Sequence, residues 1–66
     1  MKITVKQARI GKEMSQAEMA NCLGVNLSTY KRYEKDPGSM RVSTAFLFSE
    51  ITKVPTTQII WNVDKN

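Results

Sequence analysis

Residues 15–34, SQAEMANCLGVNLSTYKRYE, decide the fold, because this stretch reads as a helix, a sharp turn and a second helix. Ser15 and Glu18 precede a set of apolar residues at the spacing of a capping box, which marks a helix start. The apolar residues that then recur at helical spacing are Met19, Ala20 and Leu23. Gly24 follows at once, where a helix end favours a residue that tolerates positive φ. Asn26 then supplies a side-chain oxygen that can cap the next helix.

The second helix, residues 27–35, is expected to have one apolar face and one basic face. At about 100° per residue, Tyr30 and Tyr33 lie within roughly 60° of each other and form the apolar stripe. The residues on the opposite side are Ser28, Lys31, Arg32 and Lys35, with Leu27 at the edge. Such a face is either a solvated lysine-rich surface or one that suits the negatively charged groove of a nucleic acid. The turn and the short helix before it favour the second interpretation, since a helix-turn-helix places its second helix in the DNA major groove.

The same stretch resembles the helix-turn-helix of the phage repressor and Cro superfamily, also called the XRE family of bacterial regulators. That family typically shows Ser or Thr, then Gln, an acidic residue, a hydrophobic-Ala pair, a Leu-Gly pair and a Glu that closes the second helix. The positions that match without gaps are Ser15, Gln16, Glu18, Met19, Ala20, Leu23, Gly24 and Glu34. The resemblance covers about residues 4–61. It implies an all-α, compact five-helix lambda-repressor-like DNA-binding domain.

Caps, apolar spacing and helix breakers set the boundaries of the remaining helices within a single domain, residues 1–66. Thr4 with Gln7 predicts the start of a first helix. Gly11 is expected to take the left-handed turn after it, since Glu13 stands where the family usually has glycine. The helices expected along the chain cover residues 5–12, 16–23, 27–35, 42–53 and 56–62, and the polar tail after them is expected to fray.

Composition narrows the possible functions of this 66-residue chain. A formal charge of +4 favours an anionic partner such as nucleic acid. The absence of histidine and the presence of a single cysteine, Cys22, argue against a zinc site, and Cys22 is expected to pack as a small apolar residue. The sequence shows no signal peptide and no apolar run of the roughly 20 residues that a membrane span needs, so we expect a cytoplasmic protein.

The resemblance also implies an ion pair between two helices and a set of contacts to the DNA backbone. In the family, an arginine at the place of Arg9 pairs with the glutamate that ends the recognition helix, here Glu34. The pair would fix the angle of that helix on its scaffold. The family's glutamine at Gln16 braces the DNA backbone, although a solvent-facing role at the helix start is the alternative. The side chains expected to contact phosphates are Gln16, Lys35, Ser39, Arg41 and Ser43.

The side chains expected to contact bases lie at the start and on the basic face of the second helix. Arg32 is the main candidate, because a guanidinium can bond both acceptors on the edge of guanine. The full set is Asn26, Leu27, Ser28, Lys31 and Arg32. One such domain reads few base pairs, so we expect a homodimer on a near-palindromic double-stranded operator. The short chain resembles the Cro-like type of repressor, unless it is a fragment of a longer protein.

Several large apolar residues near the C-terminus do not fit a single core face. Ala45, Phe48 and Ile51 repeat at helical spacing, which makes them the core side of the helix over residues 42–53. The residues left over are Phe46 and Leu47 on that helix and Ile60 and Trp61 after it. All four are candidates for a dimer or partner surface. A broad core stripe is the alternative for Phe46 and Leu47, and contact with the first helix is the alternative for Ile60 and Trp61.

These observations give two hypotheses for the function. The first is a sequence-specific double-stranded DNA-binding transcriptional regulator of the Cro or repressor type, which inserts its basic helix into the major groove as a dimer. The second is an antitoxin or antirepressor type of protein-binding module that uses the exposed apolar residues. An enzyme is not expected, because histidine, a glycine-rich phosphate loop and paired carboxylates are all missing from the sequence. We expect no metal and no cofactor.

Overall fold

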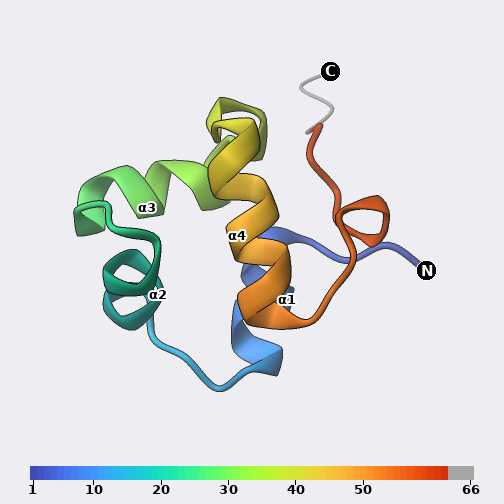
Figure 1. Cartoon of the computed structure of the whole chain (residues 1–66), viewed down its shortest axis with the longest axis horizontal. Helices are drawn as coiled ribbons and strands as arrows, with labels where there is room; N and C mark the ends of the chain where they lie inside the picture. The colour runs from blue at the N-terminus through green and yellow to red at the C-terminus, as the bar shows by residue number, and fades with distance from the viewer. Residues whose placement is uncertain (63–66) are drawn as a thin grey trace.

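The computed structural model describes residues 1–62, and Figure 1 shows that α-helices make up most of this part. The helices are α1 (Val5–Gly11), α2 (Gln16–Leu23), α3 (Leu27–Lys35) and α4 (Val42–Thr52). Two short 3₁₀ turns complete the described part, namely η1 (Pro37–Ser39) and η2 (Thr56–Gln58). The all-helical prediction is therefore confirmed. The predicted fraying concerns the tail, of which residues 63–66 lie outside the described range.

The helix starts follow the predicted side-chain caps. The Thr4 hydroxyl oxygen accepts from the backbone N–H of Gln7 at 3.0 Å, and the Gln7 side chain accepts from the Thr4 N–H at 2.8 Å. Ser15 and Glu18 form the same reciprocal pair at the start of α2, again at 3.0 and 2.8 Å. Asn26 opens α3 by accepting from the N–H of its third residue at 2.8 Å. These bonds satisfy backbone donors that a helix start would otherwise leave unpaired.

The turn between α1 and α2 differs from the prediction. Gly11 is the last residue of α1, and Glu13 takes the left-handed conformation with φ 56°. The expectation that Gly11 would make this turn was wrong, because the bend falls at the sequence position where the family usually has glycine. Gly24, in contrast, has φ 73° at the end of α2, as its position in the sequence predicts.

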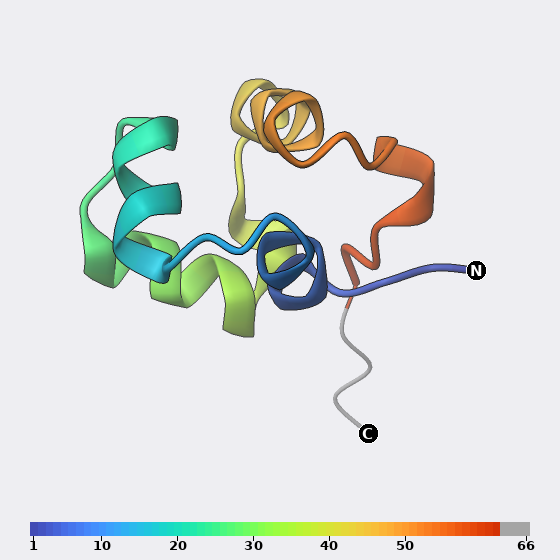
Figure 2. The same ribbon diagram turned by 90° about the horizontal axis from the view of Figure 1, so that it is seen from below.

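The predicted fifth helix over residues 56–62 is not present. Only the turn η2 forms, and Ile59 then pairs with Ile3 as a parallel β-bridge. The Ile3 N–H donates to the Gln58 carbonyl at 2.8 Å, and the Ile60 N–H donates to the Ile3 carbonyl at 2.8 Å. The two adjacent isoleucines favour extended backbone, and a segment this short gains little from helix formation. Figure 2 shows the N-terminal segment and the C-terminal segment side by side, away from α2 and α3.

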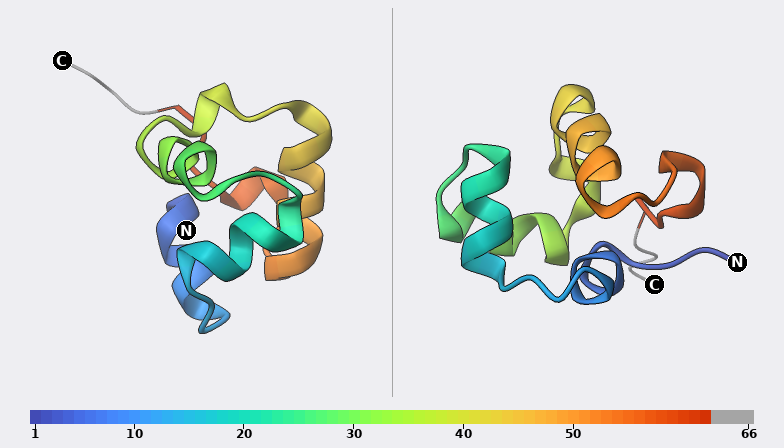
Figure 3. Two further views of the ribbon diagram at one scale, coloured as in Figure 1. Left: turned by 90° about the vertical axis from the view of Figure 1, so that its left-hand side faces the viewer. Right: turned by 60° about the horizontal axis from the view of Figure 1, so that its bottom comes forward.

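The core lies where the four helices meet. Its largest fully buried side chains are Val5, Met19, Tyr30, Phe48 and Ile59, so every α-helix and the C-terminal segment contribute one. Figure 3 shows α2 and α3 lying across each other at one end of the molecule, with α4 beside them. The buried Thr52 hydroxyl donates to the Phe48 carbonyl at 2.9 Å, which satisfies a polar group on the core side of α4. This core holds α3 at the surface with one side free.

Candidate nucleic-acid interface

Two tyrosines anchor α3 to the core. Tyr30 is fully buried and Tyr33 is 8% exposed. Their rings meet edge to face, with centroids 6.3 Å apart and planes at 84°. This geometry is favourable for aromatic pairs, and the large buried area fixes which side of α3 faces inward. The opposite side of the helix is therefore turned to solvent.

All five predicted base-contact residues are exposed on this side of α3 and at its start. They are Asn26, Leu27, Ser28, Lys31 and Arg32. The Asn26 side-chain oxygen already accepts from the Thr29 N–H at 2.8 Å and from the Ser28 hydroxyl at 2.9 Å. Asn26 consequently has only its amide N–H groups to offer a base, and Ser28 has acceptor capacity left. The two cationic side chains provide the remaining donors.

The segment after α3 contributes further exposed polar side chains. Lys35, Ser39, Arg41 and Ser43 are all exposed. The turn η1 packs against α3, and Figure 1 shows that α3, this turn and the start of α4 lie along one edge of the molecule. The Ser39 hydroxyl donates to the Asp36 carbonyl at 2.7 Å, which closes the turn. The predicted phosphate contacts of this segment therefore lie at the end of α3 and on the chain that directly follows it.

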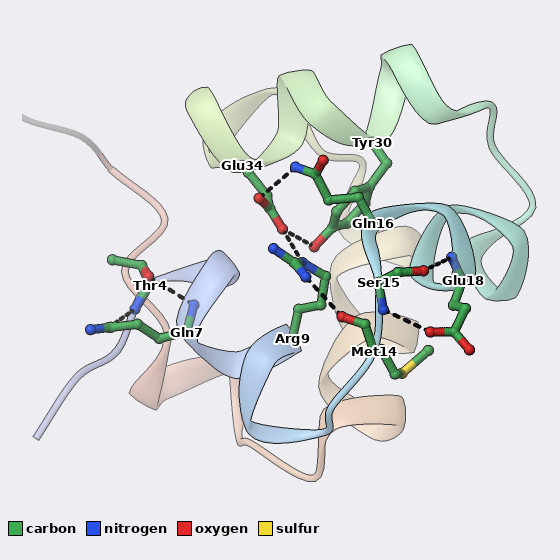
Figure 4. Close-up of polar contacts among 9 residues, drawn as sticks. All are labelled: Thr4, Gln7, Arg9, Met14, Ser15, Gln16, Glu18, Tyr30 and Glu34. Atoms are coloured by element: carbon green, nitrogen blue, oxygen red, sulfur yellow. Dashed lines mark hydrogen bonds and ion pairs between the residues drawn. The ribbon is translucent and has the colours of Figure 1, made fainter.

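A buried carboxylate at the end of α3 joins three other residues. Arg9 Nε donates to Glu34 Oε2 at 2.6 Å, and the Tyr30 hydroxyl donates to the same oxygen at 2.7 Å. Gln16 Nε2 donates to Glu34 Oε1 at 3.0 Å. Figure 4 shows these side chains converging on Glu34 from α1, α2 and α3. The ion pair expected between Arg9 and Glu34 is thus present, with side chains only 11% and 8% exposed.

The environment of Glu34 favours its charged form. Burial alone would raise the pKa of this carboxyl, but the hydrogen bonds from Arg9, Tyr30 and Gln16 and the charge of Arg9 outweigh it and hold the pKa below its usual value. The hydrogen bond to Glu34 raises the pKa of Arg9 in turn. Burial, followed by the bond to Glu34, raises the pKa of Tyr30. All these groups therefore keep one protonation state at neutral pH.

The network extends beyond the single pair that the sequence predicts. Arg9 Nη1 also donates to the Met14 carbonyl at 2.8 Å, which ties α1 to the loop before α2. Gln16, which was expected to contact the DNA backbone, is half-buried, and one of its amide N–H groups donates to Glu34. Its second amide N–H remains available for a phosphate. The sequence analysis placed Tyr30 in the apolar stripe and did not predict that its hydroxyl group would bond Glu34. Its spacing of one helical turn from Glu34 was the available signal.

An apolar groove lies beside this edge of the molecule. It has a volume of about 250 Å³ and is lined by Met40, Val42, Ala45, Phe46, Thr56 and Trp61. The Trp61 indole N–H donates to the Thr56 carbonyl at 2.8 Å, so the ring is held in place as one wall. Of the other residues expected at a partner surface, Leu47 is 39% and Ile60 is 36% exposed. Cys22, predicted to be packed, is exposed instead, because it lies on the side of α2 away from the core.

Residues 1–62 contain no group of three or more histidine, cysteine or acidic side chains that could hold a metal ion. Over the same residues, no helix has both the length and the apolar character needed to cross a membrane.

The fold and the exposed basic helix define a helix-turn-helix protein, with α2 and α3 as the two helices of the motif. The model of the Helix-turn-helix family matches residues 5–59. The chain therefore belongs to this family, and within it to the phage repressor and Cro-like (XRE) type.

A curated relative extends this comparison. The cryptic phage CTXphi transcriptional repressor RstR of Vibrio cholerae is 27% identical over 62 residues, which cover 94% of this chain and 56% of the relative. The chain therefore spans little more than half the length of that protein. No solved structure matches the chain significantly.

Proposed function

We propose that this chain is a sequence-specific regulator of transcription that binds double-stranded DNA, with α3 as its recognition helix in the major groove. The observation that carries the proposal is the position of α3. Two buried tyrosines and the carboxylate of Glu34 fix its inner side, so Lys31 and Arg32 point outward from a rigid support. Preorganised cations of this kind suit a polyanion, because little ordering is needed on binding.

The individual roles divide into base reading and backbone positioning. Arg32 would bond guanine, and Leu27 would pack against a thymine methyl group. Asn26 and Ser28 would meet base edges as donor and acceptor, and Lys31 would reach a base or a phosphate. The backbone contacts would come from Gln16, Lys35, Ser39, Arg41 and Ser43. Such contacts set the register of the protein on the duplex and carry no sequence information.

A homodimer on a near-palindromic site follows from the small size of the domain. Two copies related by a two-fold axis would read half-sites about one helical turn apart. The likeness to RstR, which is named a transcriptional repressor, supports repression as the regulatory outcome.

Selection of bound duplexes from a random pool tests this proposal. A symmetric enriched motif is the expected result, and a pool without any enriched sequence would contradict sequence-specific recognition.

The exposed Phe46 and the adjoining groove favour a second candidate, a protein-binding module of the antitoxin or antirepressor type. That candidate predicts no duplex binding even at low salt.

A further inference from the structure

The C-terminal segment lies against the loop that joins α3 to α4, residues 36–41. A Cβ atom placed on Gly38 in this loop would lie 3.5 Å from the carbonyl oxygen of Trp61, so the two stretches of backbone are nearly in contact. The Trp61 side chain packs against the core and borders the apolar groove together with Met40 and Val42, the two neighbours of Arg41. Trp61 therefore meets the loop both at Gly38 and around Arg41.

Trp61 itself is held in place by contacts outside the loop. Its indole N–H donates to the Thr56 carbonyl at 2.8 Å, and the backbone N–H of the preceding Ile60 donates to the Ile3 carbonyl at 2.8 Å. Ile59 is only 2% exposed and belongs to the core. The turn η2, the N-terminal segment and the core thus fix the C-terminal segment, which can serve as a support for the loop.

The loop depends on packing for its position. Its own hydrogen bonds are local: the Ser39 N–H donates to the Asp36 carbonyl at 3.0 Å, and the Met40 N–H donates to the Pro37 carbonyl at 3.1 Å. Bonds between residues three apart set the shape of a turn but not its place on the domain. The buried residues of the loop are Pro37 and Met40, and Met40 borders the same groove as Trp61.

We infer that Trp61 is a positioning residue for DNA binding, which holds the loop where Ser39 and Arg41 reach the DNA backbone. The inference rests on the proposed function, in which these two side chains contact phosphates, and it adds a residue that acts through the loop. Without the indole ring, the chain on both sides of Arg41 would lose part of its packing. The guanidinium would then have to be ordered on binding, and such ordering lowers affinity.

A double-mutant cycle tests whether Trp61 acts through Arg41. Effects of substitutions at independent sites add in free energy, whereas effects that pass through one contact do not. Trp61→Ala should weaken binding to a labelled duplex of random sequence, measured by fluorescence anisotropy, by roughly 2- to 30-fold. Most of this loss should be absent when Arg41→Ala is already in place. In the Lys35→Ala background the loss should be complete, because Lys35 lies at the end of α3 and does not border the groove.

The salt dependence of binding gives a second readout. Trp61→Ala should reduce the log–log slope by about 0.9, the share of one phosphate contact, whereas a mere loss of folded protein would leave the slope unchanged. Gln58→Ala is the matched control, since Gln58 lies on the same segment, is exposed and does not border the groove. Far-UV circular dichroism and thermal unfolding check that each variant is folded at the assay temperature. Trp61→Leu, which keeps an apolar side chain without the indole, replaces Trp61→Ala if the alanine variant is unfolded.

The outcomes separate this inference from the proposed function. A loss confined to proteins that carry Arg41, with a reduced salt slope and an unaffected control, supports the inference. Wild-type affinity of the Trp61 variant, an equal loss with and without Arg41, or the same loss in Gln58→Ala would overturn it. In those three cases the wild type still binds DNA, so the proposed function stands. Failure of the wild type to bind any duplex is the distinct result that removes both.

Discussion

Arg9 and Glu34, 25 residues apart in the sequence, meet through a hydrogen bond of 2.6 Å between Nε and Oε2. The bond joins α1 to the last turn of α3, and the Gln16 bond to the same carboxylate adds the start of α2. Three helices therefore share one charged centre at the C-terminal end of α3. Such a centre fixes an angle between helices more directly than apolar packing does, because hydrogen bonds are directional.

Removal of the guanidinium should destabilise the fold. Arg9→Met keeps most of the side-chain length and leaves Glu34 buried without its cation, at a cost of about 3 kcal/mol in the free energy of unfolding. Urea unfolding followed by far-UV circular dichroism measures this cost. The double variant Arg9→Met/Glu34→Gln should recover part of it, because the neutral amide can still accept from Tyr30. A loss no greater than that of Lys6→Ala, an exposed site on the same helix, would show that the pair contributes little.

The stability of the protein should fall in acid, and Glu34 should account for part of the fall. Its pKa is lowered from the usual 4.5, so the unfolded chain takes up a proton first as the pH decreases. The contribution is present above the unfolded pKa and is lost from about pH 5 downward through the folded pKa. Glu34→Gln should therefore flatten the decline in the free energy of unfolding measured by urea titration between pH 6 and about pH 3.

Glu18→Gln is the companion variant for this measurement. The pKa of Glu18 is also lowered, by hydrogen bonds within the capping box at Ser15, so it contributes to the acid decline in the same direction. Glu18→Gln gives the share of the acid decline that comes from the capping box, and Glu34→Gln gives the share that comes from the buried network. Identical pH profiles for wild type and Glu34→Gln would contradict the assignment.

The left-handed residue between α1 and α2 offers a way to stabilise the fold. Glu13 has φ 56°, a conformation that costs a non-glycine residue roughly 1 kcal/mol. Glu13→Gly should raise the midpoint of thermal unfolding, since the relief of strain exceeds the added freedom of the unfolded chain. Gly11→Ala is the matched comparison: Gly11 is helical, and a Cβ there meets no atom within 4 Å. A lower midpoint of thermal unfolding for Glu13→Gly than for the wild type would contradict backbone strain at Glu13.

Replacement of Arg32 should change which sequences the protein selects. Arg32→Ala should cost roughly 1–3 kcal/mol on the enriched site and relax the preference at one base pair. Lys35→Ala should weaken binding to all sequences alike, because its expected partner is a phosphate. Fluorescence anisotropy on the enriched site and its single-base variants distinguishes the two patterns. Uniform weakening by Arg32→Ala would mean that Arg32 contacts only the backbone.

The features that could be predicted from the sequence are local ones. The caps at Thr4, Ser15 and Asn26 and the left-handed Gly24 depend on neighbouring residues, so their spacing alone was sufficient. The orientation of α3 followed in the same way from the helical spacing of its tyrosines. The resemblance supplied the one long-range contact that was predicted, between Arg9 and Glu34.

The features that were missed depend on contacts between distant parts of the chain. The chain becomes extended at Ile59, after the turn η2, because Ile59 pairs with Ile3, a partner that no local pattern reveals. Gln16 turned toward Glu34 because α2 and α3 bring these residues together. The groove beside Phe46 likewise needs Met40 and Trp61 from outside α4, so the sequence indicated exposed apolar residues but not the shape that they form.

The central claim, that the exposed side of α3 and the adjoining loop form a DNA-binding surface, is tested most directly by the salt dependence of binding to a random duplex. Four exposed cations, Lys31, Arg32, Lys35 and Arg41, predict a log–log slope of about −3.6 if each neutralises one phosphate. Lys35→Ala should reduce the slope by about 0.9, and Lys6→Ala on α1 should leave it unchanged. Absence of duplex binding at low salt, or an equal effect of the two substitutions, would contradict the account.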